Sequence, residues 1–177
     1  FVFSTGEALV YQGDDPENSL RWSSSGRFQI GEPIGIRSHC KVGGTEIILT
    51  KDGWLDIATA LSGGRLSEAS TYSDKIIQAA KQAATQYSSF FGWECLYYPA
   101  GNLFIVNIPK GDYAEIPGGG GSEWAIQSEQ HARNTSTGAW CRFTGWPAST
   151  FAVWKDVLYF ASGGRVYTAD VGTSDVG

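Results

Sequence analysis

The chain has 177 residues and a formal net charge of −5. Hydrophobic residues make up 42% of it and aromatic residues 14%, and 23 residues are glycine. This acidic charge gives no electrostatic footprint for nucleic-acid binding, and no apolar run reaches the roughly 18 residues that a membrane-spanning helix needs. We therefore expect no membrane-spanning segment, and a fold of many short strands joined by tight turns.

The first part of the chain reads as paired strands. Phe1–Thr5 and Ala8–Gln12 form a predicted hairpin around Gly6. Leu20–Ser23 and Arg27–Ile30 form a second predicted pair, with its turn at residues 24–26. The glycine and serine clusters between these apolar runs are typical turn signals.

Three further strands follow before the pattern changes. They are predicted at Arg37–Val42, Glu46–Thr50 and Trp54–Ala58. The Lys-Asp-Gly turn that ends at Gly53 is among the strongest short-range signals for a hairpin, because Asp-Gly stands between two apolar runs.

One amphipathic helix is predicted as an insertion at about residues 66–89. Apolar residues recur there at near-helical spacing, and Thr71 or Ser73 stands where a helix N-cap is favoured. The residues of this apolar stripe are Ile76, Ile77, Ala80, Ala83, Ala84 and Tyr87. We expect the helix to lie across an outer strand or to reach a neighbouring subunit.

Strands resume after the helix and continue to the end of the chain. A glycine-rich loop is predicted at about residues 109–122, and its Gly-Gly-Gly-Gly-Ser run resembles a flexible linker, either natural or engineered. Gly138 lies in the turn of one predicted hairpin. The strands predicted in this part are Trp93–Tyr98, Asn102–Ile108, Ser128–Asn134, Trp140–Thr144, Phe151–Trp154, Leu158–Phe160 and Val166–Ala169.

A hairpin pattern repeats along the chain. Residues 42–58 align without gaps over residues 153–169, which places Gly53 over Gly164, and a second alignment places Gly6 over Gly101. Units of three or four antiparallel strands at intervals in the forties are typical of propeller blades. The sequence therefore predicts a mostly β fold of about three and a half propeller-like blades. Because a closed propeller needs at least about four blades, and because the chain has no methionine, we expect residues 1–177 to be one region of a longer chain.

No motif for catalysis, cofactor binding or metal binding is present. His39 and His131 have no partner at a metal-ligand spacing, and Cys40, Cys95 and Cys141 are odd in number and widely spaced, which favours buried free thiols. The tryptophans are expected to pack in the β core, whereas glycan binding would need several of them exposed on one face. The packing residues in this prediction are Trp22, Trp54, Trp93, Trp140, Trp146 and Trp154.

Four segments carry a resemblance to a known group of proteins. They are Ser4–Pro16, Arg27–Gly35, Asn134–Trp146 and Leu158–Tyr167, the last preceded by Phe-Ala-Val at residues 151–153. In their order, they resemble the carboxy-terminal part of tail-nozzle or head-completion (packaged-DNA stabilisation-like) virion proteins of short-tailed bacteriophages. The individual motifs are general strand and turn patterns, so the order of the segments carries the resemblance.

The resemblance implies a structural, non-enzymatic protein. Such a protein would be part of the virion tail, assembled in the bacterial host cytoplasm as a homo-oligomeric ring beside other tail, portal or adaptor proteins. DNA would pass through the ring without specific binding. The net charge of −5 separately motivates the hypothesis of an acidic lumen along which DNA slides. The alternative is a propeller-type, lectin-like binding module that recognises a host glycan, and a hydrolase is a third hypothesis.

Overall fold

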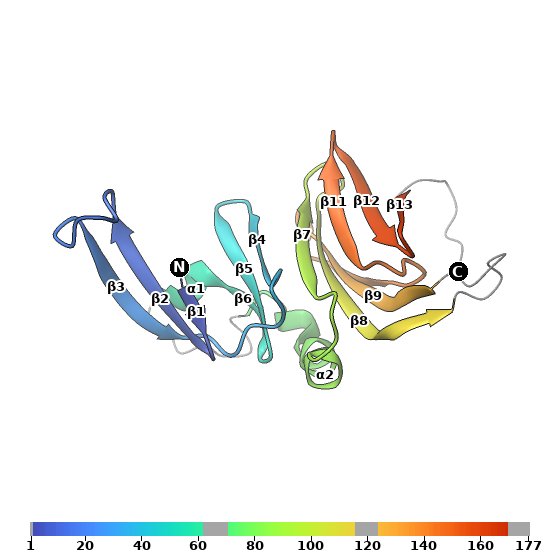
Figure 1. Cartoon of the computed structure of the whole chain (residues 1–177), viewed down its shortest axis with the longest axis horizontal. Helices are drawn as coiled ribbons and strands as arrows, with labels where there is room; N and C mark the ends of the chain where they lie inside the picture. Colours follow the sequence, from blue (N-terminus) through green and yellow to red (C-terminus); the bar gives the residue numbers. More distant parts are fainter. Residues whose placement is uncertain (1, 62–70, 116–123, 170–177) are drawn as a thin grey trace.

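The structure, a computed structural model, describes residues 2–61, 71–115 and 124–169 (Figure 1). Strands account for 52% of the residues and helices for 13%, which confirms the mostly β prediction. The strands form four small antiparallel sheets. Within the described residues, every helix is too short or too polar to span a bilayer.

Each sheet is a meander in which every strand pairs with the next one along the chain. The first sheet contains β1 (Val2–Ser4), β2 (Glu7–Gly13) and β3 (Trp22–Gln29). The second contains β4 (His39–Val42), β5 (Thr45–Thr50) and β6 (Gly53–Asp56). The third contains β7 (Glu94–Tyr98), β8 (Leu103–Glu115), β9 (Trp124–Asn134) and β10 (Trp140–Phe143). The fourth contains β11 (Thr150–Trp154), β12 (Val157–Ser162) and β13 (Arg165–Thr168).

The four sheets follow one another in chain order along the molecule (Figure 1), and a hydrophobic core fills each of the three spaces between them. Side chains alternate between the two faces of a strand, so neighbouring residues of the second and third sheets enter different cores. Ile48 lies in the core shared with the first sheet, whereas Ile47 and Leu49 lie in the core shared with the third. Phe104 and Ile105 divide in the same way between the two sides of the third sheet.

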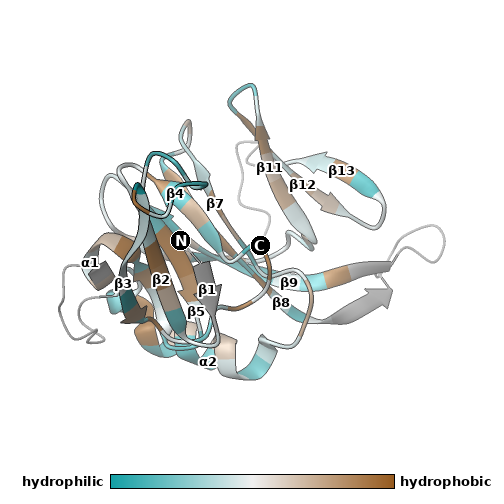
Figure 2. Ribbon diagram, turned by 60° about the vertical axis from the view of Figure 1, so that its left-hand side comes forward, coloured by the Kyte–Doolittle hydropathy of each residue, from teal (hydrophilic) through white to brown (hydrophobic). Residues whose placement is uncertain are grey.

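Two short helices cover the cores. Helix α1 (Ile57–Leu61) begins directly after β6 and contributes Ile57 and Ala60 to the core between the first two sheets. Helix α2 (Ile77–Tyr87) follows a 3-10 turn at Asp74–Ile76 and packs Ala80, Ala83 and Ala84 into the core between the second and third sheets. Figure 2 shows apolar residues on α1 and on the neighbouring strand β2.

The predicted helix is present, but its regular part is shorter than residues 66–89, of which residues 66–70 lie outside the described residues. Ser73 stands at the N-cap position of the 3-10 turn that leads into α2, but it does not cap the turn through its side chain. Its hydroxyl makes no capping hydrogen bond to the helix and instead accepts one from the backbone N–H of Trp54, at 3.0 Å. Ser73 therefore joins the start of the helix to β6.

Other local predictions need correction. Residues 20–30 do not form a hairpin, because β3 is one continuous strand that pairs with β2 around a bulge between Val10 and Tyr11. Residues 57–58 begin α1 instead of ending a strand. The first part of the predicted glycine-rich loop, residues 109–115, belongs to β8, and residues 116–122 lie outside the described residues.

The hairpin repeat is real, but its register is one residue from the gapless alignment. Every bound of β12 and β13 lies 112 residues after the corresponding bound of β5 and β6, whereas the alignment used 111. The turn residue Gly164 therefore corresponds to Asp52 and not to Gly53, which is the first residue of β6. A slip of one residue matters because it exchanges the two faces of a strand.

The second alignment pairs hairpins with different turns. Two residues, ending at Gly6, join β1 to β2, whereas four residues join β7 to β8. In the longer turn, it is Asn102 and not Gly101 that has a positive φ, of 52°.

Candidate functional site

Polar side chains gather at two places that the sequence did not single out. One joins the beginnings of three strands, and we name it the strand-start cluster: Arg37, Glu94, Ser149, Thr150 and Phe151. The other lies between α2 and the third sheet, and we name it the helix-side pocket.

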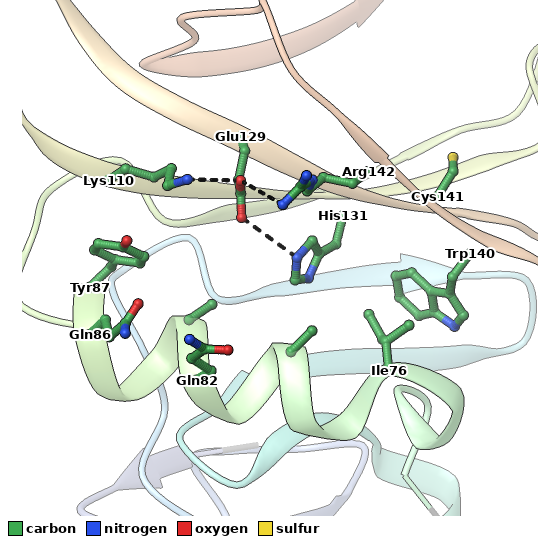
Figure 3. A pocket seen from close by; sticks show the side chains of 12 residues that line it. Ile76, Gln82, Gln86, Tyr87, Lys110, Glu129, His131, Trp140, Cys141 and Arg142 are labelled. Carbon is green, nitrogen blue, oxygen red and sulfur yellow. Dashed lines mark hydrogen bonds and ion pairs between the residues drawn. The ribbon is translucent and has the colours of Figure 1, made fainter.

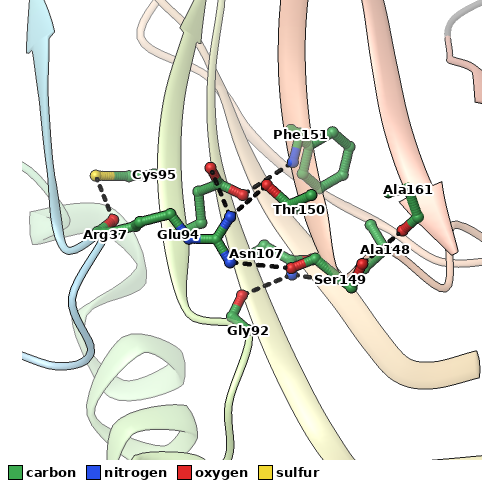
Figure 4. Close-up of polar contacts among 10 residues, drawn as sticks. All are labelled: Arg37, Gly92, Glu94, Cys95, Asn107, Ala148, Ser149, Thr150, Phe151 and Ala161. Carbon is green, nitrogen blue, oxygen red and sulfur yellow. Dashed lines mark hydrogen bonds and ion pairs between the residues drawn. The ribbon is translucent and has the colours of Figure 1, made fainter. Parts of the chain in front are cut away.

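The strand-start cluster exists because the first strands of the second, third and fourth sheets lie beside one another. Arg37, just before β4, forms a parallel bridge with Glu94 at the start of β7. The Glu94 carboxylate lies 3.5 Å from the Arg37 guanidinium and accepts a hydrogen bond from the backbone N–H of Phe151, at 2.9 Å (Figure 4). Arg37 also donates to the Thr150 hydroxyl and to the Ser149 carbonyl. One carboxylate and one guanidinium therefore hold three sheets together.

A second polar network supports this junction from inside the third sheet. The buried Asn107 amide donates to the carbonyls of Gly92, at 2.8 Å, and Ala148, at 2.9 Å (Figure 4). The buried Gln130 amide donates to Asn107 Oδ1, at 2.9 Å, and to the Trp146 carbonyl, at 3.0 Å. Because buried polar groups are costly unless they are hydrogen-bonded, this network fixes the chain segments that lead into β7 and β11.

The helix-side pocket has a volume of about 430 Å³ (Figure 3). Strand register explains its polar wall, because His131 pairs with Val106 on one side and with Arg142 on the other, so these positions share one face of the sheet. The opposite wall is α2, which presents the small side chains Ala79 and Ala83 and so leaves open space. The pocket is lined by Ile76, Ala79, Gln82, Ala83, Gln86, Tyr87, Lys110, Glu129, His131, Trp140, Cys141 and Arg142.

Glu129 is the centre of the charged wall. Its carboxylate lies 3.0 Å from Lys110 Nζ, 3.8 Å from Arg142 and 3.9 Å from His131 Nε2. His131 is buried, and its Nδ1 has no hydrogen-bond partner. Burial lowers the pKa of His131, Glu129 opposes this shift, and Arg142 and Lys110 add to it. His131 is therefore neutral at neutral pH, and the charged set consists of two cations and one carboxylate.

The predicted thiols are free, but only Cys95 is buried, whereas Cys40 is half-buried and Cys141 is exposed. A hydrogen bond with the Cys40 thiol, together with burial, raises the pKa of Cys95 well above its ordinary value. Among the described residues, no group of three or more His, Cys, Asp or Glu side chains is placed to hold a metal ion. His39 lies on the exposed side of β4, with Nδ1 2.8 Å from the Glu46 carboxylate.

The tryptophans do not all pack as predicted. Trp54 and Trp93 are buried in the core between the second and third sheets, with ring centroids 6.0 Å apart. Trp140 and Trp146 are partly buried against two different cores. Trp22 stacks on Tyr11 at the surface, and Trp154 is 61% exposed. The side chain of Trp124 lies outside the described residues.

One feature of the sequence points to the charged wall of the pocket. Glu129, His131 and Arg133 occupy alternate positions of a strand that was correctly predicted, so all three must share one face of the sheet. Lys110 and Arg142, the cations that pair with Glu129, are placed there by strand register, which no local pattern reveals.

Comparison of the chain with protein-family models, curated proteins and solved structures returned no match.

Proposed function

We propose that the four sheets are blades of a propeller-like structural module, and that the module is part of the tail nozzle or head-completion ring of a short-tailed phage. The tail role rests on the sequence resemblance of the four segments described above, and the propeller-like architecture rests on the arrangement of the first strands. β4 and β7 contact each other, β7 and β11 contact each other, and each strand begins a separate meander sheet. Meander sheets whose first strands lie side by side are the building principle of propellers.

The mechanism of such a module is geometric. The strand-start cluster ties three sheets together through partly buried charges, so the sheets keep their relative orientation under load. Rigid sheets can then present their loops to neighbouring subunits around the DNA exit channel. The net charge of −5 would weaken contact between DNA phosphates and the channel wall, which favours sliding.

The fourth sheet supports association into a ring. All four residues of its last strand, β13, are exposed, including Val166 at 72% and Tyr167 at 37%. Trp154 is exposed on the same sheet. A strand edge with exposed apolar side chains favours pairing with another chain. We propose that this edge contacts the next subunit.

Light scattering after size-exclusion chromatography, with negative-stain electron microscopy, tests the proposal. We expect a closed ring of about six or twelve copies, in line with the closed symmetry of most oligomers. Val166→Asp should disrupt the ring, whereas Leu20→Asp, at a still more exposed apolar position in the loop before β3, should not. A particle that stays monomeric at every concentration would overturn the ring proposal.

The exposed Trp154 supports a second candidate, a lectin-like binding module. Lys155 Nζ lies 4.4 Å from the centre of the Trp154 ring, so an aromatic face and a cation are presented together at the surface. A glycan array with the native chain and with Trp154→Ala tests this candidate. Binding that the substitution abolishes would favour it over the structural role.

A further inference from the structure

We propose that the helix-side pocket binds a small hydroxylated organic anion, whose carboxylate or phosphate group is held by Lys110 and Arg142. This site goes beyond the structural role proposed above. Its volume of about 430 Å³ lies within the roughly 300–1,000 Å³ of typical small-molecule sites. The 3-10 turn at Asp74–Ile76 contributes to it together with α2, β8, β9 and β10, so the site is built by the tertiary fold.

The charges of the wall select for an anion. Lys110 and Arg142 carry two positive charges, and Glu129 is the single carboxylate that faces them. Lys110 donates one hydrogen bond to Glu129, at 3.0 Å. Arg142 lies farther away, at 3.8 Å, and its side chain is 65% exposed. Its guanidinium donates no hydrogen bond to any described residue, so its fork of N–H donors is free to bind a carboxylate or phosphate.

The deep part of the wall is also incompletely paired. The His131 side chain is only 8% exposed and points from β9 toward α2 (Figure 3), yet its Nδ1 has no hydrogen-bond partner. Trp140 Nε1, on the adjacent strand, is likewise buried without a partner. Buried polar atoms usually have a hydrogen-bond partner, so these two atoms are available to polar groups of a ligand, although four other such atoms of the described residues lie outside the pocket lining.

The helix side of the pocket offers neutral polar groups. Gln82 and Gln86 are exposed, lie one turn apart on α2, and make no hydrogen bond to the described residues. Amides both donate and accept, so they suit hydroxyl groups on the same ligand. Ala79 and Ala83 leave the space between these glutamines and the charged wall. A hydroxylated ligand with one acidic group therefore satisfies both walls.

Three sugar probes distinguish the forms of this ligand: glucuronate carries a carboxylate, glucose 6-phosphate carries a phosphate, and glucose is neutral. Binding is followed by the amide resonances of α2 and β10 in a nitrogen-15-labelled protein and by calorimetry. We expect one or both acidic sugars to bind with a dissociation constant of about 1 mM or lower, and glucose to bind at least about tenfold more weakly. Binding of glucuronate alone would identify a carboxylate site, and binding of glucose 6-phosphate alone a phosphate site.

Variants test the position of the site. Arg142→Gln should weaken binding by about tenfold or more, because a charge-assisted interaction is lost. Ala79→Trp should abolish binding by filling the pocket, whereas Gln78→Trp places the same side chain at an adjacent exposed helix position outside the pocket lining. The proposal is overturned if glucose binds as well as the acidic sugars, if none of the probes binds, or if binding survives both Arg142→Gln and Ala79→Trp.

Discussion

Removal of the Glu94 carboxylate should loosen the junction of three sheets. In Glu94→Ala, the backbone N–H of Phe151 loses its acceptor at 2.9 Å, and Arg37 loses its ion pair at 3.5 Å. This N–H is buried, so water cannot replace the lost acceptor. Loss of such a charge-assisted hydrogen bond costs about 1.5–3 kcal/mol.

The ion pair adds less. Because the Arg37 side chain is 34% exposed, its attraction to Glu94 is screened by water, and we assign about 0.5–1 kcal/mol to it. The expected loss for Glu94→Ala is therefore about 2–4 kcal/mol of unfolding free energy. Glu94→Gln keeps one acceptor and should lose only about 1 kcal/mol.

Urea unfolding followed by tryptophan fluorescence measures this loss. With a denaturant dependence of about 1–3 kcal/mol per molar urea, the midpoint of Glu94→Ala should fall by about 1 M or more. Glu32→Ala is the control, because Glu32 pairs with Lys51 in an exposed ion pair, where the expected loss is under about 0.5 kcal/mol. Amide exchange at Phe151 should also accelerate in Glu94→Ala. If Glu94→Ala unfolds at the same urea concentration as Glu32→Ala, the cluster does not stabilise the junction.

Three further predictions concern single positions. Gly53→Ala should lower the unfolding free energy by about 1–3 kcal/mol, because φ is 127° and a Cβ would lie 2.7 Å from Ile77 Cδ1. Gly44→Ala is the control: it has open space around it and should change stability by less than about 0.5 kcal/mol in the same urea assay. Burial lowers the pKa of His131 in the folded state, so the unfolded chain binds the proton first and stability should fall as the pH drops below about 6.5. His131→Gln should flatten this dependence in urea titrations across pH, and an unchanged slope would contradict the assignment. N-ethylmaleimide should label the exposed Cys141 of the folded protein before the buried Cys95, and peptide mapping that finds the reverse order would contradict the burial described here.

Local patterns predicted the strands well where turn chemistry was strong. The Asp-Gly signal correctly placed the hairpin of β5 and β6, and the helical spacing correctly placed α2. The prediction was wrong at Ser24–Gly26, where three residues with turn preference lie inside β3. There, pairing with the long strand β2 outweighs local preference, because each ladder hydrogen bond is gained only when both strands are present.

The candidate sites were less accessible to prediction, because they depend on contacts between distant parts of the chain. Arg37, Glu94 and Phe151 lie 57 residues apart in turn, and nothing near any one of them indicates that a carboxylate will reach a backbone N–H in another sheet. The pocket likewise needs the register of β8 with β9 and of β9 with β10. The tryptophans stand out in the sequence, but most of them pack in cores.

The third sheet separates the proposed structural role from the proposed ligand binding, because successive side chains of β9 point to opposite faces of the sheet. On β9, Gln130 faces the fourth sheet and joins the buried network with Asn107, whereas its neighbours Glu129 and His131 face α2 and line the pocket. Consecutive residues therefore belong to opposite sides of one sheet. Substitutions such as Arg142→Gln and Ala79→Trp act on the pocket side alone, so they should leave assembly through β13 unchanged. Loss of ligand binding without loss of assembly would show that the scaffold and the pocket are independent functions of the same sheet.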